Sequence, residues 1–426
     1  MLRKNWSVIV IVLLIMVIAL GITISAEPKK VKLVYWTHWE QNPLFNAYYV
    51  TAGKEFSKLH PECEGVEVVT IPYSGYEAKY LSTFMAKTGA PDIFNGAAYD
   101  WAGRYQFADE MPSSLAKNVD ENAVNSALNA GVFNGVRYGI PVEGGNFMMM
   151  YINTDMYKEA GLDPNKPPTT FTELLEHAKK LTKYDANGKV IRSGYGIRYS
   201  GNQTGITDKF LPTLHAFGGI MVDLEFKKGS GFVNSPAAIE ALTFYGDLVN
   251  KYKVSSLEVG NSEVAFGKGL AAIIFRESWL AGWMEQNAPD IKYKVYALPS
   301  QKVAPGPGAL FLWADMVYQY SPNKELAWEF MRFMWSKEND LGRSQAQGLT
   351  PVMKACFETD VVKARPEYNA VIESNKRPPA PNYSNPKTTE ITYAYGDAVL
   401  DVIYGKKDAK TALDEAAVKI DQILKQ

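Results

Sequence analysis

Residues 138–153, which read YGIPVEGGNFMMMYIN, constrain the fold more than any other stretch of the chain. A Gly and a Pro punctuate the first half of this stretch, and a continuous apolar run, which predicts a buried strand, fills the second half. Between them Glu143 lies in a glycine-flanked turn, and Asn146 follows it. The sequence before this stretch predicts one α/β unit, and the sequence after it begins another. We therefore expect the chain to cross between two lobes here, with Glu143 and Asn146 beside a ligand cleft, because clefts occur preferentially at domain interfaces.

The order of the predicted elements indicates the fold class. Strands are expected at 30–37, 66–71 and 92–94, with helices at 46–59 and 76–87 between them. This βαβαβ order predicts a mostly parallel sheet flanked by helices. Strands and helices continue to alternate after the crossing, and a chain of 426 residues is too long for one ordinary core. We therefore predict an α/β protein with two lobes, each built on such a sheet.

Two later segments predict further crossings between the lobes. Residues 301–308 are rich in Pro and Gly, and residues 347–351 form another loop that contains both. Three crossings make each lobe discontinuous in sequence. We expect the N-terminal lobe to hold 27–140 with about 309–350, and the C-terminal lobe to hold 141–308 with about 351–426.

The first 26 residues predict a signal peptide. Arg3 and Lys4 supply a basic start, residues 8–24 are almost wholly apolar, and Ser25-Ala26 offers small residues for cleavage. An uncleaved anchor is the alternative, although the apolar run is short for a spanning helix of ~20 residues. No Cys lies near the cleavage site, so we expect no lipid anchor. We therefore expect the mature chain to work outside the cytoplasm.

Charge excludes one class of partner, and aromatic content suggests another. The net charge is -1 and the pI is near 6.5, so no basic excess exists to neutralise phosphates and we expect no nucleic-acid partner. Aromatic residues make up 12% of the chain, including 9 Trp and 25 Tyr. Such residues fill cores, but they also suit the flat apolar faces of sugar rings, or cations.

The only cysteines are Cys63 and Cys356, and their spacing leaves open whether they pair.

Aromatic and polar side chains recur together where the predicted strands end. They follow the strands expected at 30–37, 92–94, 271–275 and 309–313. In open α/β sheets the ligand crevice lies outside the carboxyl ends of the strands, so four such groups predict one shared site. For any single Trp, packing in the core is the alternative. The candidate ligand contacts are Trp36, His38, Trp39, Glu40, Asn95, Tyr99, Asp100, Trp101, Glu277, Trp279, Trp283, Trp313 and Asp315.

The motifs of common catalytic sites are missing from the sequence. It contains no GxxxxGK[ST] or GxGxxG phosphate loop, no GxSxG elbow and no HExxH, and its four His residues are scattered. We therefore expect no enzyme activity, no cofactor and no metal site. A secreted glycosidase is the alternative of another class. Its two carboxylates could be Glu143 and Glu277, whose separation in space the sequence does not fix.

A series of short motifs, weak one by one, is specific in its order and spacing. Together they make the chain resemble the extracellular solute-binding proteins of maltose-binding-like carbohydrate ABC transporters, over nearly all of the mature chain. The motifs are KLVYW at 32–36, GAPDIF at 89–94, YGIPV at 138–142, YIN at 151–153, EAGL at 159–162, PTTFTEL at 168–174, FGKGLAA at 266–272, SPNKELA at 321–327, GLTP at 348–351 and ALDEA at 412–416.

The resemblance implies two α/β lobes joined by a hinge, which close on a sugar or oligosaccharide. It also implies delivery of the ligand to membrane permease subunits, with no chemistry on the ligand. Because such a ligand contacts both lobes, it favours the closed form. The family's lipobox Cys, common in its Gram-positive members, is absent here, which suggests a periplasmic protein. We further expect a monomer.

By position in the motifs, the resemblance implies roles for particular residues. Trp279 matches the family's stacking aromatic, Asn95 and Glu143 match positions that often touch ligand, and residues 38–40 lie in the first-strand loop. A polyamine or another cationic solute is the alternative ligand, because clusters of aromatic and carboxylate side chains suit cations too. The mixture of His38, Asn95 and Arg276 with the carboxylates favours a sugar.

Overall fold

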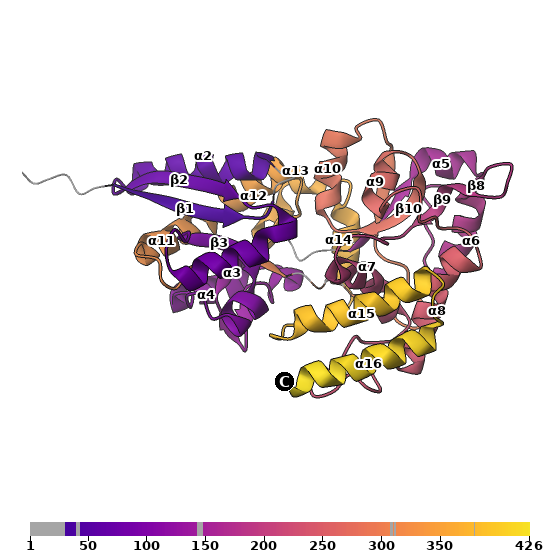
Figure 1. Ribbon diagram of the computed structural model, residues 1–426. Helices are drawn as coiled ribbons and strands as arrows, with labels where there is room; N and C mark the ends of the chain where they lie inside the picture. Colours follow the sequence, from indigo (N-terminus) through magenta and orange to yellow (C-terminus); the bar gives the residue numbers. More distant parts are fainter. Residues whose placement is uncertain (1–29, 40–42, 143–147, 307–309, 311, 379) are drawn as a thin grey trace, which may run out of the picture.

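The computed structural model describes residues 30–39, 43–142, 148–306, 310, 312–378 and 380–426. Over these residues the chain forms two α/β halves that lie next to one another, each with its own five-stranded sheet (Figure 1). The predicted fold class, an α/β protein with two lobes, is confirmed.

The first sheet contains strands from both ends of the sequence. β1 pairs in parallel with β2 and β3, while β12 runs antiparallel to β3 and β6, so β12 alone among these five runs the opposite way. Adjacent strands follow the spatial order β2 (Cys63–Thr70), β1 (Val31–Thr37), β3 (Ile93–Ala97), β12 (Trp313–Val317) and β6 (Gly139–Pro141).

The position of β12 corrects one expectation. We predicted a strand over 309–313 that ends at Trp313, whereas β12 begins there and Asp315 lies in its middle. The pairing of Trp313 with Ala97 nevertheless places Trp313 at the carboxyl end of β3, because an antiparallel strand starts where its neighbour ends. The error in the strand therefore leaves Trp313 at the predicted edge of the sheet.

Helices α2 and α11 pack side by side against the first sheet, since Phe56 and Phe330 meet with ring centroids 5.3 Å apart. α2 lies close against β2, since a Cβ atom at Gly53 would come within 2.6 Å of the backbone nitrogen of Val66. α11 buries Ala327, Phe330 and Met331, whose spacing of three to four residues forms one apolar stripe. The elements of this half outside the sheet are α2 (Pro43–Leu59), η1 (Tyr73–Gly75), α3 (Tyr76–Ala86), η2 (Tyr99–Arg104), α4 (Ser113–Asn122), η3 (Asn125–Ala127), the hairpin β4 (Val132–Phe133) and β5 (Val136–Arg137), α11 (Lys324–Met334), α12 (Lys337–Gln347), η4 (Lys354–Glu358) and α13 (Asp360–Lys363).

The second sheet is built around β10, whose six residues are all buried. β10 pairs in parallel with β9 and antiparallel with β7, and β11 runs antiparallel to β7. Its continuous apolar run is typical of a strand covered on both faces. Adjacent strands follow the order β11 (Tyr293–Tyr296), β7 (Met149–Asn153), β10 (Ala271–Arg276), β9 (Val190–Gly196) and β8 (Lys183–Tyr184).

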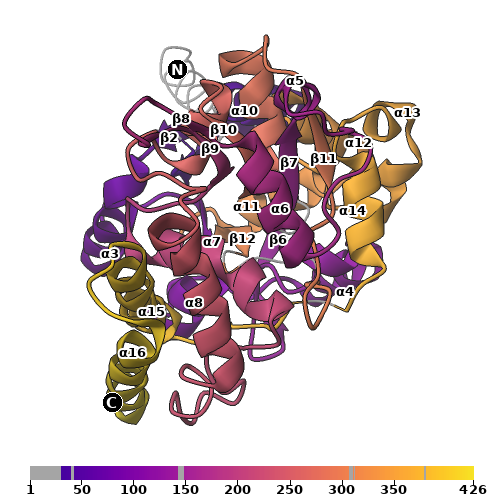
Figure 2. The same cartoon turned by 90° about the vertical axis from the view of Figure 1, so that its right-hand side faces the viewer.

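Two helices of the second half begin at residues whose side chains cap them. The Thr170 hydroxyl accepts from the backbone N–H of Glu173 at 3.1 Å, and Ser235 caps α8 with Pro236 as the first helical residue. Both cartoon views show the last two helices, α15 and α16, side by side (Figures 1 and 2). The helices are α5 (Thr154–Glu159), α6 (Phe171–Leu181), α7 (Gln203–Ala216), α8 (Pro236–Asn250), α9 (Ser262–Gly267), α10 (Trp279–Asn287), α14 (Tyr368–Asn375), α15 (Thr388–Ile403) and α16 (Ala409–Lys425).

The chain passes between the sheets at three places. It leaves β6 for β7, and it returns from β11 to β12, in line with the first two predicted crossings. Met353 still bridges Ala123 of the first half, and α14 lies beside β11. The third passage therefore follows residue 353, slightly later than the loop at 347–351, and the limits of the lobes remain a proposal.

Two further expectations concern the cysteines and the membrane. Cys63 and Cys356 are both buried and both free, which answers the question that their spacing left open. Within the described ranges, no helix combines the length and the apolar character needed to cross a bilayer. The predicted signal segment, 1–26, lies outside those ranges.

Candidate functional site

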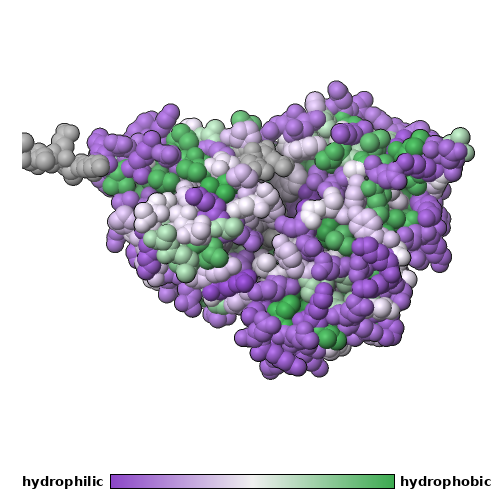
Figure 3. Space-filling model, in the orientation of Figure 1, coloured by the Kyte–Doolittle hydropathy of each residue, from purple (hydrophilic) through white to green (hydrophobic). Residues whose placement is uncertain are grey.

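The surface is indented where the two halves meet (Figure 3). A group of aromatic side chains lies at the carboxyl end of the first sheet. His38 lies just after β1. The centroid of its ring is 4.3 Å from the ring centroid of Trp313, 4.7 Å from that of Tyr76, 5.5 Å from that of Tyr73 and 5.7 Å from that of Trp39. We name these five residues the His38 cluster. The structure thus brings three predicted contacts together. It adds two tyrosines that we missed, although the PYSGY segment after the predicted strand at 66–71 was a comparable signal.

His38 provides a buried polar atom within this aromatic cluster. Burial lowers the pKa of His38 to about 3, so the imidazole is neutral at pH 7. Its Nδ1 atom is buried and has no hydrogen-bond partner among the described residues. A neutral ring nitrogen can accept or donate one hydrogen bond, while the rings around it offer flat apolar faces. The cluster therefore has the chemistry to hold a hydroxyl next to a CH face.

Asn95 and Asp315 lie behind this cluster and not at its surface. Asp315 accepts hydrogen bonds from Tyr35 at 2.8 Å, from Asn95 at 2.8 Å and from Tyr49. The indole N–H of Trp39 donates to Asn95 at 3.1 Å. Burial raises the pKa of Asp315, and the bonds that it accepts oppose that rise. Both side chains are fully buried and fix β3, β12 and the Trp39 indole in place, and their contact with ligand stays a prediction.

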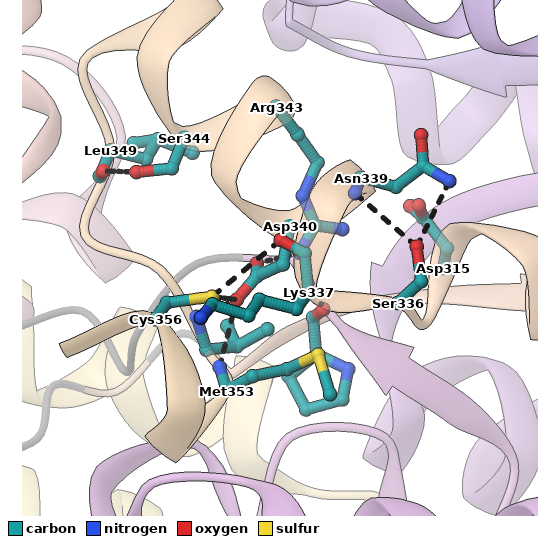
Figure 4. Close-up of polar contacts among 12 residues, drawn as sticks. Asp315, Ser336, Lys337, Asn339, Asp340, Arg343, Ser344, Leu349, Met353 and Cys356 are labelled. Carbon is teal, nitrogen blue, oxygen red and sulfur yellow. Dashed lines mark hydrogen bonds and ion pairs between the residues drawn. The ribbon is translucent and has the colours of Figure 1, made fainter. Parts of the chain in front are cut away.

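A second set of buried polar groups extends this network to the crossings. Arg343 donates to Tyr49 at 3.4 Å and to Asp340 at 2.9 Å, and it reaches the carbonyl of Pro141 just before the first crossing. Asp340 in turn accepts from the backbone N–H groups of Val352, at 2.9 Å, and Met353, at 2.8 Å (Figure 4). The buried network behind the His38 cluster is thus tied by hydrogen bonds to the segments that lead into two crossings.

Three predicted tryptophans pack inside the halves. Trp36 lies beside Tyr80 and Phe84, with ring centroids 5.6 and 6.3 Å apart. Trp101 is fully buried and also packs on Phe84, at 5.4 Å. Trp283 lies against α9, where it occupies the space that a side chain at residue 267 would need. Trp36 and Trp101 are therefore buried in the core of their own half, whereas Trp283 is half-buried, and ligand contact at these three positions stays a prediction.

The η2 turn, which carries Tyr99 and Asp100, contacts the second half directly. Thr389 of α15 donates to Asp100 at 3.4 Å, and Arg104 forms an ion pair with Glu390 at 2.8 Å. Burial raises the pKa of Asp100 to about 7, Glu77 adds to the rise, and Arg104 opposes it. Two polar contacts between the halves therefore come from a turn that the sequence placed at the site.

A buried series of charges faces this edge from the second half. Lys209 of α7 lies 2.5 Å from both Asp208 and Glu277, and Arg276 lies 3.4 Å from Glu277 and 3.8 Å from Glu263. We name these five residues the buried ion chain. Asp208 and Lys209, both almost fully buried, were missed because a helix of mixed apolar and polar residues gives no sign of which charges point inward.

The buried ion chain lies close to residues of the first half. Burial raises the pKa of Tyr73 to about 12, while Asn202 and Arg198 oppose the rise and Asp208 adds to it. Asp208 also contributes to the raised pKa of Tyr99. The charges of α7 are therefore felt by side chains on η1 and η2, across the boundary between the halves.

Trp279 begins α10 directly after this chain. The guanidinium carbon of Arg276 lies 4.7 Å from the centre of its ring, which is a cation–π arrangement. Burial acts to raise the pKa of Glu277, but Arg276 and Lys209 outweigh it and hold the pKa at about 2. The end of β10 thus presents an indole, a guanidinium and an ionised carboxylate in one place.

A model of one protein family matches residues 51–370, three quarters of the chain. That family is the bacterial extracellular solute-binding proteins. This chain belongs to it. A protein of Brucella abortus named as a binding protein is 24% identical over 418 residues, covering 96% of each chain. The arabinooligosaccharide-binding protein of Bacillus subtilis is 24% identical over 357 residues, 81% of this chain and 78% of that one.

A solved structure supports the fold of this solute-binding protein. The solute-binding protein of an ABC transporter from Thermotoga lettingae, bound with α-D-tagatose, superposes with a TM-score of 0.79 at 23% identity. The match covers 92% of this chain and 99% of that one. The resemblance that the sequence motifs indicated is therefore confirmed for the family and for the two-lobed architecture.

Some predicted contacts of this solute-binding protein cannot be placed. Glu40, Glu143 and Asn146 lie outside the described residues and stay predictions. Within the described part of the chain, no group of three or more His, Cys, Asp or Glu side chains could hold a metal ion. The predicted contacts that the structure brings to the boundary between the halves are His38, Trp39, Tyr99, Asp100, Glu277, Trp279 and Trp313.

Proposed function

We propose that this protein binds an uncharged sugar or short oligosaccharide between its halves and delivers it to the permease subunits of an ABC importer. The observation that carries the proposal is the meeting of two unlike surfaces, the neutral His38 cluster and the buried ion chain. Sugar rings present CH faces that stack on aromatic rings and hydroxyls that bind carboxylates and guanidinium groups. The ligands in the names of the relatives above, an arabinooligosaccharide and tagatose, belong to the same chemical class.

The charges of the site favour a sugar over a cationic solute such as a polyamine. A cation requires carboxylates whose charge is not already balanced. Lys209 and Arg276 already lie within ion-pair distance of Glu277, and Lys209 also pairs with Asp208. A polyamine that approached Glu277 would meet both of these positive groups first, which costs repulsion.

The state of Glu277 also argues against a glycosidase. A general acid at this position needs a raised pKa, so that it holds a proton at neutral pH. The pKa of Glu277 is instead held at about 2 by its two cationic neighbours, against the effect of burial. We expect no hydrolysis of aryl glycosides. Hydrolysis that disappears in Glu277→Gln would overturn this part of the proposal.

We further infer that binding closes the two lobes over the ligand. The lobes are those predicted from the sequence, 27–140 with about 309–350 and 141–308 with about 351–426. Contacts such as the one between Arg104 and Glu390 exist only when the halves approach, so a ligand that touches both halves favours the closed arrangement. Small-angle scattering should show a smaller radius of gyration with saturating ligand. An unchanged radius with a ligand proven to bind would contradict closure.

The test of function is a titration of the mature protein, followed by tryptophan fluorescence and thermal shift. The panel holds arabinose, arabino-oligosaccharides, tagatose, ribitol, maltotriose, spermidine and putrescine. We expect saturation by one sugar class and a rise in melting temperature, since a ligand that binds only the folded state stabilises it. A parallel sample is unfolded and refolded to remove ligand retained during purification. A response to the polyamines alone would overturn the sugar assignment.

Two tryptophans of α10 make a matched pair for placing the site. Trp279→Ala removes the ring beside Arg276, so we expect affinity to fall by about tenfold or more, the scale of losing one stacked aromatic contact. Trp283→Ala removes the same kind of ring one turn later, where it packs against α9. Trp283→Ala should lower thermal stability and change affinity little. Equal losses of affinity in both variants would contradict the placement.

We also propose a secreted, periplasmic monomer without a lipid anchor. The basic and apolar start of the sequence supports export, and no Cys lies near the expected cleavage site after residue 26. Mass spectrometry of the protein recovered from the periplasm should give a mature N-terminus near residue 27. Retention of residues 1–26 in a membrane fraction would favour the uncleaved anchor instead.

A further inference from the structure

The buried ion chain alternates in sign, and two of its inner members, Glu277 and Arg276, have unused hydrogen-bonding capacity. Its order in space is Asp208, Lys209, Glu277, Arg276 and Glu263, with neighbours 2.5 to 3.8 Å apart. Three carboxylates and two cations leave this chain with one net negative charge. Arg276 is 3% exposed and Glu277 is 6% exposed, so these charges interact with little screening by water.

Four polar atoms at the end of β10 are buried without a hydrogen-bond partner among the described residues. They are Nε and Nη1 of Arg276, Oε2 of Glu277 and Oγ of Ser278, of which Nε and Oε2 face each other in an ion pair at 3.4 Å that is not a hydrogen bond. Leaving such atoms without hydrogen bonds in a buried site costs free energy, so they favour any ligand that satisfies them. All three residues immediately precede Trp279, at the boundary between the halves.

These atoms differ in whether they donate or accept hydrogen bonds with a ligand. The two guanidinium nitrogens only donate hydrogen bonds, the carboxylate oxygen only accepts, and the Ser278 hydroxyl does both. A sugar hydroxyl both donates and accepts, so one hydroxyl can satisfy Glu277 and its neighbour can satisfy Arg276. An ionised phosphate only accepts. It would pair with Arg276 but leave Glu277 unpaired, at close range to a like charge.

We infer that Arg276, Glu277 and Ser278 select an uncharged polyhydroxyl ligand and reject the phosphorylated form of the same sugar. This inference rests on the proposed function, because it concerns the same site. It goes further by naming the residues that decide between a free sugar and its phosphate ester. Lys209 acts on this choice as a positioning residue, since it balances Glu277 without carrying an unpaired atom.

The test compares neutral and phosphorylated members of matched pairs by titration calorimetry at one salt concentration. The probes are arabinose with arabinose 5-phosphate, tagatose with tagatose 6-phosphate, and glycerol with glycerol 3-phosphate. For the pair whose neutral member binds, the wild-type protein should prefer that member by about a hundredfold, the scale expected when buried polar groups are left unpaired. Equal affinity for the two members would overturn the inference while leaving the proposed function intact.

Three substitutions separate hydrogen bonding from overall charge. Glu277→Gln removes one negative charge and the unpaired carboxylate oxygen, so we expect the preference for the neutral member to shrink by about tenfold or more. Glu263→Gln removes the same charge from the far end of the chain, 3.8 Å from Arg276, and should shrink the preference much less. Ser278→Ala leaves every charge in place. It should weaken the neutral sugar several-fold and change the preference less than Glu277→Gln does.

The outcomes are distinct. If Glu277→Gln and Glu263→Gln reduce the preference equally, net charge alone decides selectivity and the inference is wrong. If none of the neutral sugars in either panel binds to the folded wild-type protein, the proposed function fails and the inference fails with it. Thermal unfolding of each variant checks that it is folded. A variant that does not fold is replaced by Arg276→Lys, which keeps the charge but loses the forked donor geometry, and should weaken the neutral sugar.

Discussion

Asp100 gives a prediction whose sign and size follow from its surroundings. It lies on η2, almost fully buried between the halves, where Glu77 from α3, Arg104 from its own turn and Thr389 and Glu390 from α15 surround it. Burial, with Glu77 adding, raises its pKa from 3.8 to about 7. Below pH 3.8, the pKa of this carboxyl in the unfolded chain, Asp100 is neutral in both states and its burial carries no charge penalty. Above it, the folded state must either keep a proton that the unfolded chain gives up or bury a charge.

The expected effect is a loss of stability as the pH rises. For a group whose pKa is raised on folding, the favourable contribution is complete below pH 3.8 and is lost as the pH rises through about 7. At about 1.4 kcal/mol for each pKa unit, the whole rise corresponds to about 4 kcal/mol. Most of that lies between pH 5 and pH 8. Over this interval the wild-type protein should lose about 2–3 kcal/mol of unfolding free energy relative to Asp100→Asn, which does not titrate.

Urea unfolding of both proteins at pH 5, 6, 7 and 8 measures this difference. Glu277→Gln serves as the control, because the pKa of Glu277 is held at about 2 in the folded state and all its titration falls below pH 5. Its stability difference from wild type should stay constant from pH 5 to pH 8. If the wild-type and Asp100→Asn curves also run parallel over that interval, burial does not raise the pKa of Asp100, and the reasoning is refuted.

Three further predictions test other contacts. Arg343→Met leaves Asp340 as an uncompensated buried charge, so urea unfolding should show a loss of about 3–5 kcal/mol, and a loss below about 1 kcal/mol would contradict the network. The pair of Arg104 and Glu390 is one-third exposed, so a double-mutant cycle on ligand affinity should give a coupling of about 0.2–1 kcal/mol, and zero coupling would mean that closure does not use it. Cys63 and Cys356 are free and buried, and burial raises the pKa of both thiols. A thiol reagent should therefore find two reactive groups only after unfolding, and none would indicate a disulfide.

Much of the fold was predictable because its signals are local. The cap at Thr170 and the Ser235-Pro236 start of α8 depend only on residues within one turn. The bounds of β12 were not predictable in this way. Its start at Trp313 is set by pairing with β3, more than two hundred residues earlier in the sequence. An Asp in the middle of the strand also suggested that the strand had already ended.

The roles of the predicted site residues were harder to foresee than their region. Strand ends gave the right edge of the first sheet, since His38 and Trp313 meet there. The choice of aromatic residues at strand ends also selected Trp36 and Trp101. The sequence of such a residue is the same whether its ring points toward the boundary between the halves or into the core. Lys209 left no signal at all. Its part in the site comes from a turn of α7 that brings it to Glu277, 68 residues later.

The contrast between Asp315 and Glu277 shows what decides whether a buried carboxylate serves the fold or the ligand. Both were predicted as contacts, and both are buried. Asp315 is held by neutral donors from its own half, and both of its oxygens accept hydrogen bonds. Glu277 is held ionised by two cations, and its Oε2 atom, 3.4 Å from Arg276 Nε, accepts no hydrogen bond from the described residues. A buried carboxylate whose oxygens all accept hydrogen bonds from its own half stabilises the strands there. A buried carboxylate with one oxygen that accepts no hydrogen bond can gain one from a ligand. That count of hydrogen bonds, which no sequence pattern encodes, favours Glu277 over Asp315 as a polar contact of the ligand.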